Sequence, residues 1–85
     1  MKEFTYTIQD PLGIHARPAG LLVKEAARFT SKSTLVKGAK KGDLKRLFGV
    51  MTLGVKKDDV ILVTCEGEDE EAAAAALKSF FENNL

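Results

Sequence analysis

The only histidine of this 85-residue chain, His15, lies two residues before Arg17 and three before Pro18. These residues stand where a strand-like pattern gives way to a helical one, so we expect them at the start of a helix. The first NH groups of a helix have no partner inside it and attract anions, and proline is tolerated there. Arg17 adds a planar cation that binds phosphate oxygens, and imidazole is a nucleophile near neutral pH. The spacing therefore indicates a site that handles phosphoryl groups.

Two other interpretations of the histidine remain open from the residues alone. A lone histidine before a helix is most often a loop residue or a helix cap, with no chemistry of its own. A helix start with an arginine also describes a module that holds an anionic ligand without covalent chemistry. Arg17 favours an anion site, but the pattern does not choose between covalent and non-covalent binding.

The flanking segments must position this site. Apolar Phe4, Tyr6 and Ile8 alternate with polar residues, which predicts a half-buried strand that ends at Asp10 and Pro11. A helix is expected from about residue 16 to 28 or 29, since one face collects Ala19, Leu22, Val23, Ala26 and Phe29.

The rest of the chain predicts an α+β fold. We expect a hairpin over residues 34–44, with Ser33 and Gly42 at inward positions, then one or two helical turns over 47–54. The apolar run 60–65 predicts a central strand, and 67–81 a helix that opens with acidic residues. The order gives a single domain, residues 1–85, with a four-stranded, mainly antiparallel sheet and three helices on one face.

Composition narrows the function classes. The chain is 45% hydrophobic and 29% charged with a net charge of +1, so it has no overall bias toward nucleic acid or membranes. No apolar run approaches the ~20 residues that span a bilayer, and the start does not resemble a signal sequence. We expect a cytoplasmic protein. Cys65, the only cysteine, excludes an intrachain disulfide and is interpreted as structural, and no cofactor or metal is expected.

Two charged clusters have simple interpretations. The basic residues between 37 and 46 lack interleaved aromatic residues, which argues against nucleic-acid binding. They indicate a solvated edge hairpin or a rim that docks an acidic partner protein. The acidic residues 68–71 have no histidine partner, so they are interpreted as complements of the helix dipole and not as a metal site.

Three segments carry a resemblance to a known family. Residues 13–19, Gly-Ile-His-Ala-Arg-Pro-Ala, resemble the active-site motif of HPr, the histidine-containing phosphocarrier of the bacterial phosphoenolpyruvate-dependent sugar phosphotransferase system. Residues 44–54 resemble the second segment of the family, and residues 66–70 resemble its last strand-to-helix junction. The resemblance covers essentially the whole chain and implies an open-faced sandwich.

The resemblance implies a reversibly phosphorylated carrier and not a free-standing enzyme. His15 would accept a phosphoryl group on its δ nitrogen from enzyme I and pass it to IIA domains of sugar permeases, with Arg17 as its catalytic partner. The implied phosphate contacts are Ala16, Arg17 and Pro18. The implied docking residues are Gly20, Leu47, Phe48 and Met51, of which Met51 is equally well interpreted as core. We expect a monomer.

One residue departs from the family pattern. Many Gram-positive members carry a regulatory serine just before the position of Leu47, whereas this chain has Arg46, so regulation there is expected to be absent. Two alternatives to sugar transport stay open: an HPr-like regulator of nitrogen or dihydroxyacetone metabolism, and the non-covalent anion-binding module.

Overall fold

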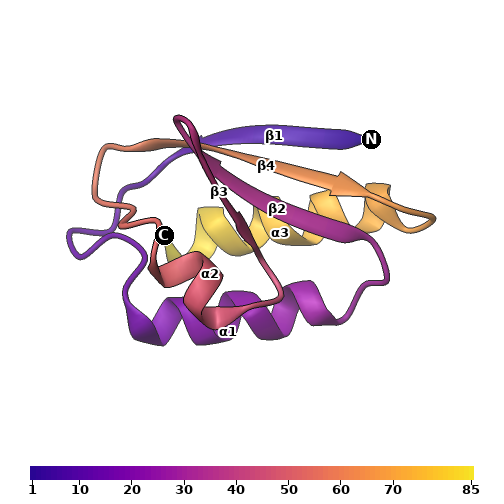
Figure 1. Ribbon diagram of the computed structural model, residues 1–85, viewed down its shortest axis with the longest axis horizontal. Helices are drawn as coiled ribbons and strands as arrows, with labels where there is room; N and C mark the ends of the chain where they lie inside the picture. The colour runs from indigo at the N-terminus through magenta and orange to yellow at the C-terminus, as the bar shows by residue number, and fades with distance from the viewer.

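The computed structural model describes all 85 residues as one sheet covered by three helices on a single face (Figure 1). The sheet has the strand order β1-β4-β2-β3, and every neighbouring pair is antiparallel. The elements follow the predicted order: β1 (Lys2–Thr7), α1 (Ala16–Ala27), β2 (Lys32–Lys37), β3 (Lys40–Asp43), α2 (Leu47–Met51), β4 (Val60–Glu66) and α3 (Glu70–Asn84). The predicted α+β class is confirmed.

The core lies between the sheet and the helices. The apolar stripe of α1 turns inward as its spacing predicts, with Ala19, Leu22 and Ala26 fully buried. Phe81 of α3 is also fully buried, and its ring packs against those of Phe4, Tyr6 and Phe80. None of the three helices has the length and apolar content needed to cross a lipid bilayer.

The predicted central strand is β4, which lies between β1 and β2. Ile61, Val63 and Cys65 are buried against the helices, while Val60 on the open face of the sheet is 61% exposed. Burial raises the pKa of the Cys65 thiol, which fits the predicted structural role.

Strand β2 begins at Lys32, two residues earlier than the apolar pattern predicts. Ser33 pairs with Cys65 across the ladder, and its buried hydroxyl lies 3.8 Å from the Cys65 sulfur. The polar residue is therefore accommodated inside the sheet, because its hydroxyl has a partner there.

A carboxylate joins the end of α1 to the start of α3. Asp69 accepts hydrogen bonds from the NH groups of Thr30 and Ser31, both at 2.9 Å, and from the Ser31 hydroxyl. The Ser31 hydroxyl, followed by the Thr30 NH, lowers the pKa of Asp69 to about 2. The residue that was expected to complement the helix dipole instead closes a contact between distant segments.

This contact predicts a pH dependence of stability. Because the folded pKa of Asp69 is lowered, its stabilisation is complete above the ordinary value of 3.8 and is lost as pH falls toward 2. Asp69→Asn should lower the free energy of unfolding at pH 7 and flatten its decline between about pH 5 and 2. Urea denaturation across this pH range measures both effects.

Glu68→Gln is the matched control, because Glu68 is an exposed carboxylate in the same turn. It should leave the decline below pH 5 as steep as in the parent protein. An Asp69→Asn variant that loses stability with acid as steeply as the parent would contradict the assignment.

Candidate functional site

His15 lies directly before the first residue of α1, with an extended backbone (φ −89°, ψ −179°). Its carbonyl accepts the first intrahelical hydrogen bond, from the Ala19 NH at 3.0 Å. Its side chain makes no capping hydrogen bond and is 36% exposed. The imidazole is therefore held at the helix start, as predicted, and is open to a partner from outside.

Unpaired donors surround the imidazole. The NH groups of Ala16 and Arg17, at the first two helical positions, have no backbone acceptor. Arg17 is exposed, and none of the ion pairs of the molecule involves it. Pro18 has no NH and is buried, so it can offer only its ring surface. Two backbone donors and one free cation are thus available to an anion beside His15.

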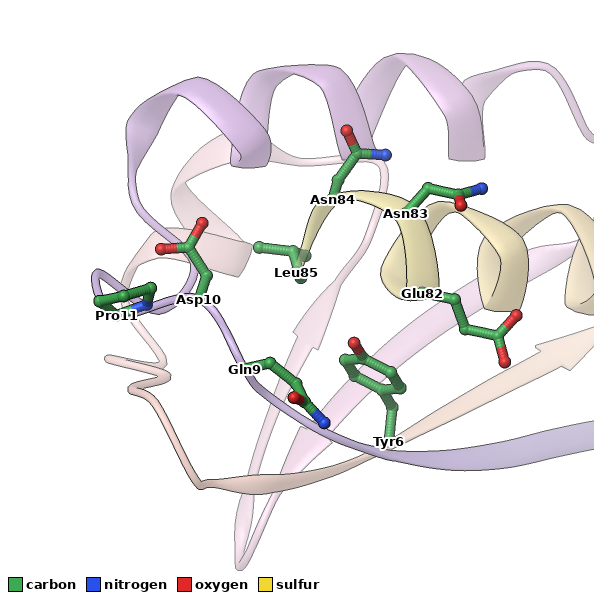
Figure 2. A pocket seen from close by; sticks show the side chains of 8 residues that line it. All are labelled: Tyr6, Gln9, Asp10, Pro11, Glu82, Asn83, Asn84 and Leu85. Carbon is green, nitrogen blue, oxygen red and sulfur yellow. The ribbon is translucent and has the colours of Figure 1, made fainter.

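The histidine borders a polar hollow of about 310 Å³ that also contains Asp10, Leu21 of α1 and Asn84 at the end of α3. The Asp10 carboxylate points toward the start of α1, with Asn84 on the same side (Figure 2). The distance from Asp10 Oδ2 to His15 Nε2 is 3.8 Å. A larger neighbouring hollow of about 550 Å³ shares Asp10 and Asn84 and opens toward Tyr6 and Glu82.

The loop before His15 is fixed against the loop that follows α2. The Ile14 NH donates to the Val55 carbonyl at 3.2 Å, and the Ile14 side chain is buried. Gly13 has φ +65°, and a Cβ added there would lie 2.2 Å from the Val55 oxygen. Only glycine fits such a conformation at such a close approach, so residue 13 determines where His15 lies.

Helix α2 exposes the predicted docking residues. Phe48 is 79% exposed, and Leu47 and Met51 are each 38% exposed, whereas Val50 faces the core. The second interpretation of Met51, as a core residue, is therefore wrong. Gly20 lies on α1, which packs against α2, and a Cβ added at Gly20 would meet no atom within 4 Å. Leu47, Phe48 and Met51 are thus exposed and Gly20 is half-buried, and the docking role of the four residues stays a prediction.

Comparisons with known proteins agree with this geometry. Residues 2–83 match the family model described as the PTS HPr component phosphorylation site. The chain is 44% identical to the phosphocarrier protein HPr of Mycoplasma genitalium over 85 residues, which are 99% of this chain and 97% of that protein. It is 40% identical to the HPr of Mycoplasma pneumoniae, with the same coverage. The chain belongs to the PTS-HPr family.

Solved structures confirm the family fold. A mycoplasma histidine-containing phosphocarrier protein superposes with a TM-score of 0.94 at 35% identity, covering 96% of this chain and 93% of that one. HPr-C-His of Thermoanaerobacter tengcongensis gives 0.93 at 42% identity, covering 98% and 93%. Members of the HPr family are phosphocarriers of the phosphotransferase system, so this chain carries phosphoryl groups and is not itself an enzyme.

The basic cluster does not form one surface. The Lys37 ammonium group binds the Gly54 carbonyl at 2.8 Å and Asp59 at 3.0 Å, and that of Lys45 binds the Phe29 carbonyl at 2.6 Å. The hydrogen bond from the Lys56 NH, followed by the one from the Lys37 ammonium group, lowers the pKa of Asp59. These two lysines hold the segments around α2 in place. The solvated-hairpin interpretation therefore does not hold for them.

Sequence reasoning missed two exposed apolar residues near the site. Leu21 is 47% exposed and borders the same hollow as His15, and Leu12 is 72% exposed in the preceding loop. The helical spacing places Leu21 outside the buried stripe of α1, so the sequence pattern could have predicted that Leu21 is exposed. Leu12 stands in a loop without periodicity, so only the structure shows its exposure.

Contact between β3 and α2 predicts a glycine requirement. A Cβ at the buried Gly42 would lie 2.3 Å from the Gly49 carbonyl oxygen of α2. We expect Gly42→Ala to push α2 outward and to lower the free energy of unfolding by about 1–3 kcal/mol. Urea denaturation measures the loss, and amide chemical shifts of residues 47–51 report the displacement.

Gly20→Ala is the control for this substitution. The new methyl group there enters open space in a helix, so we expect stability to rise by about 0.5–1 kcal/mol. Equal effects of the two substitutions would contradict the close packing of α2 on β3.

Proposed function

We propose that His15 accepts a phosphoryl group from phosphorylated enzyme I and passes it to the IIA domains of sugar permeases. The observation that carries the proposal is the uncapped imidazole of His15 next to two unpaired NH groups and the free guanidinium of Arg17. Membership in a family of phosphocarriers supplies the class of reaction.

The transfer is an in-line displacement at phosphorus. A nitrogen of His15 attacks the phosphorus atom of the donor, a new N–P bond forms, and the bond between phosphorus and the leaving atom of the donor breaks. Arg17 and the NH groups of Ala16 and Arg17 bind the phosphoryl oxygens as charge develops on them, and Pro18 forms part of the wall. A phosphorylated imidazole remains a good leaving group, so the next acceptor can take the phosphoryl group in turn.

The proposed docking surface consists of Gly20, Leu47, Phe48 and Met51. It combines exposed apolar side chains with a cation, Arg46, which lies directly before α2. Such a surface suits a partner whose own site is acidic. Enzyme I and the IIA domains would cover this same face one after the other. The proposal therefore treats the working carrier as a monomer, active in the cytoplasm.

The direct test of the proposal is His15→Ala. The parent, incubated with enzyme I and phosphoenolpyruvate, should gain the mass of one phosphoryl group, and the adduct should be labile to acid and stable to base. The variant should gain nothing yet melt close to the parent, because the His15 side chain makes no capping bond. A His15→Ala protein that is still phosphorylated, or an acid-stable adduct on the parent, would reject the proposal.

The docking surface predicts a separation of binding from folding. Phe48→Asp should weaken the complex with enzyme I by about 2 kcal/mol or more, roughly 30-fold, while leaving the melting temperature nearly unchanged. Val60→Asp is the control, because Val60 is also exposed but lies on the open face of the sheet. Titration calorimetry should show a loss of affinity only for Phe48→Asp, and equal losses would place the docking surface elsewhere.

Arg46 predicts that a family mode of regulation is absent. It lies just before α2 with its side chain 81% exposed, where many family members have a regulatory serine. The serine kinase that acts at this position should leave the parent unmodified and should phosphorylate Arg46→Ser, as read by intact mass. Ser33 is fully buried, so a regulated parent would have to be modified elsewhere, for instance at the exposed Thr52. Such a modification with loss of enzyme I binding would contradict the prediction.

A further inference from the structure

Asp10 is the carboxylate nearest to the His15 ring, and its position is fixed by its own backbone. Its NH donates to the Leu85 carbonyl at 2.8 Å, and its carbonyl accepts from the Gly13 NH at 2.9 Å. One carboxylate oxygen, Oδ1, accepts from the Leu12 NH at 2.8 Å and closes a tight turn. The other oxygen, Oδ2, is left to face His15 Nε2 at 3.8 Å.

We propose that Asp10 is a positioning residue that holds the proton of His15 on Nε2 and thereby directs the phosphoryl group to Nδ1. An ionised carboxylate only accepts hydrogen bonds, so it favours the ring tautomer that presents an NH to it. Nδ1 then keeps the lone pair. The inference rests on the proposed function, because it concerns which nitrogen of His15 reacts.

The distance of 3.8 Å between Asp10 Oδ2 and His15 Nε2 is longer than a hydrogen bond, but it would shorten when the ring becomes positively charged. Contacts of this kind are often long in a resting protein and tighten when charge develops on the ring. Both side chains are partly shielded, with His15 36% and Asp10 25% exposed, so the attraction is only partly screened by water.

Covalent geometry also favours Nδ1. This nitrogen is bonded to the ring carbon that joins the side chain, so it lies nearer the backbone than Nε2 does. A phosphoryl group on Nδ1 is therefore nearer to the unpaired NH groups of Ala16 and Arg17. Nε2 lies on the side of Asp10, whose negative charge would repel a phosphoryl group bound there.

The atoms and charges balance without another reagent. The Nδ1 lone pair forms the new N–P bond, and the electrons of the bond between phosphorus and the donor's leaving atom return to that atom. The proton on Nε2 stays in place, so the His15 ring becomes a cation that is paired with the Asp10 carboxylate. In the onward step the same electrons return to Nδ1, and the neutral Nε2-protonated ring is restored.

The test is Asp10→Asn, because the tight turn fixes which way the amide points. The Leu12 NH needs an acceptor, so the amide oxygen takes the place of Oδ1 and the NH₂ group takes that of Oδ2. That NH₂ group needs a lone pair on Nε2, which moves the ring proton to Nδ1. Nitrogen chemical shifts of the unphosphorylated protein with a neutral His15 ring should show this change of tautomer.

Transfer from phosphorylated enzyme I should be about tenfold slower in Asp10→Asn. The group that orients the imidazole then donates a hydrogen bond where the carboxylate accepts one, and the effect is moderate because the site is partly exposed. Asp43→Asn is the matched control: Asp43 closes the same kind of turn with the Lys45 NH but lies near Arg46. It should leave the His15 tautomer unchanged. If Asp10→Asn does not fold, Asp10→Ser retains an acceptor for the turn and should only remove the preference for protonated Nε2.

The outcomes separate the two proposals. A tautomer unchanged in Asp10→Asn or Asp10→Ser, or a parent phosphorylated on Nε2, would overturn the role of Asp10 and leave phosphorylation of His15 intact. A parent that shows the Asp10-dependent tautomer but accepts no phosphoryl group would reject the proposed function while leaving the effect of Asp10 on the ring established.

Discussion

The hydrogen bond from the Ile14 NH to the Val55 carbonyl is the constraint on which the rest of the site depends. It joins the residue before His15 to the loop that leaves α2, and the absence of a side chain at Gly13 lets the two backbones approach. Lys37 binds the same loop through the Gly54 carbonyl. His15 and the exposed face of α2 are therefore fixed to a common anchor, so a partner that docks on α2, as we propose, is brought to the imidazole in a defined orientation.

The charges around His15 suit a carrier that must release what it binds. In the proposed function, one exposed arginine and two backbone NH groups attract the phosphoryl group, but the adjoining hollow of about 310 Å³ is open and includes the Asp10 carboxylate. An enclosed pocket with several cations would hold the phosphoryl group too tightly to pass it on. We infer that the partner proteins complete the site, which explains why the apolar residues beside it remain exposed.

Local patterns in the sequence predict the fold, whereas contacts between distant segments leave no local pattern. The stripe of α1 and the alternation in β1 are each visible within a few residues, and both elements form within a few residues of the expected ends. The His15–Pro18 spacing is equally local, and the structure has these residues at the start of α1 as expected. The early start of β2 is not visible, because Ser33 is tolerated only through its cross-strand partner Cys65. In the same way, the sequence indicates only a helix-dipole residue at Asp69, because its contact with Ser31 joins segments that lie far apart in the chain. The approach of Asp10 to His15 depends on a tight turn and has no periodic signal.

We propose above all that a phosphoryl group on His15 is held by the first NH groups of α1. Amide proton chemical shifts of the ¹⁵N-labelled protein, recorded before and after phosphorylation by enzyme I, test it most directly. The account predicts large downfield shifts at Ala16 and Arg17, where new hydrogen bonds to phosphoryl oxygens form, and small changes in the sheet. Stoichiometric phosphorylation that leaves both of these amides unshifted would contradict it.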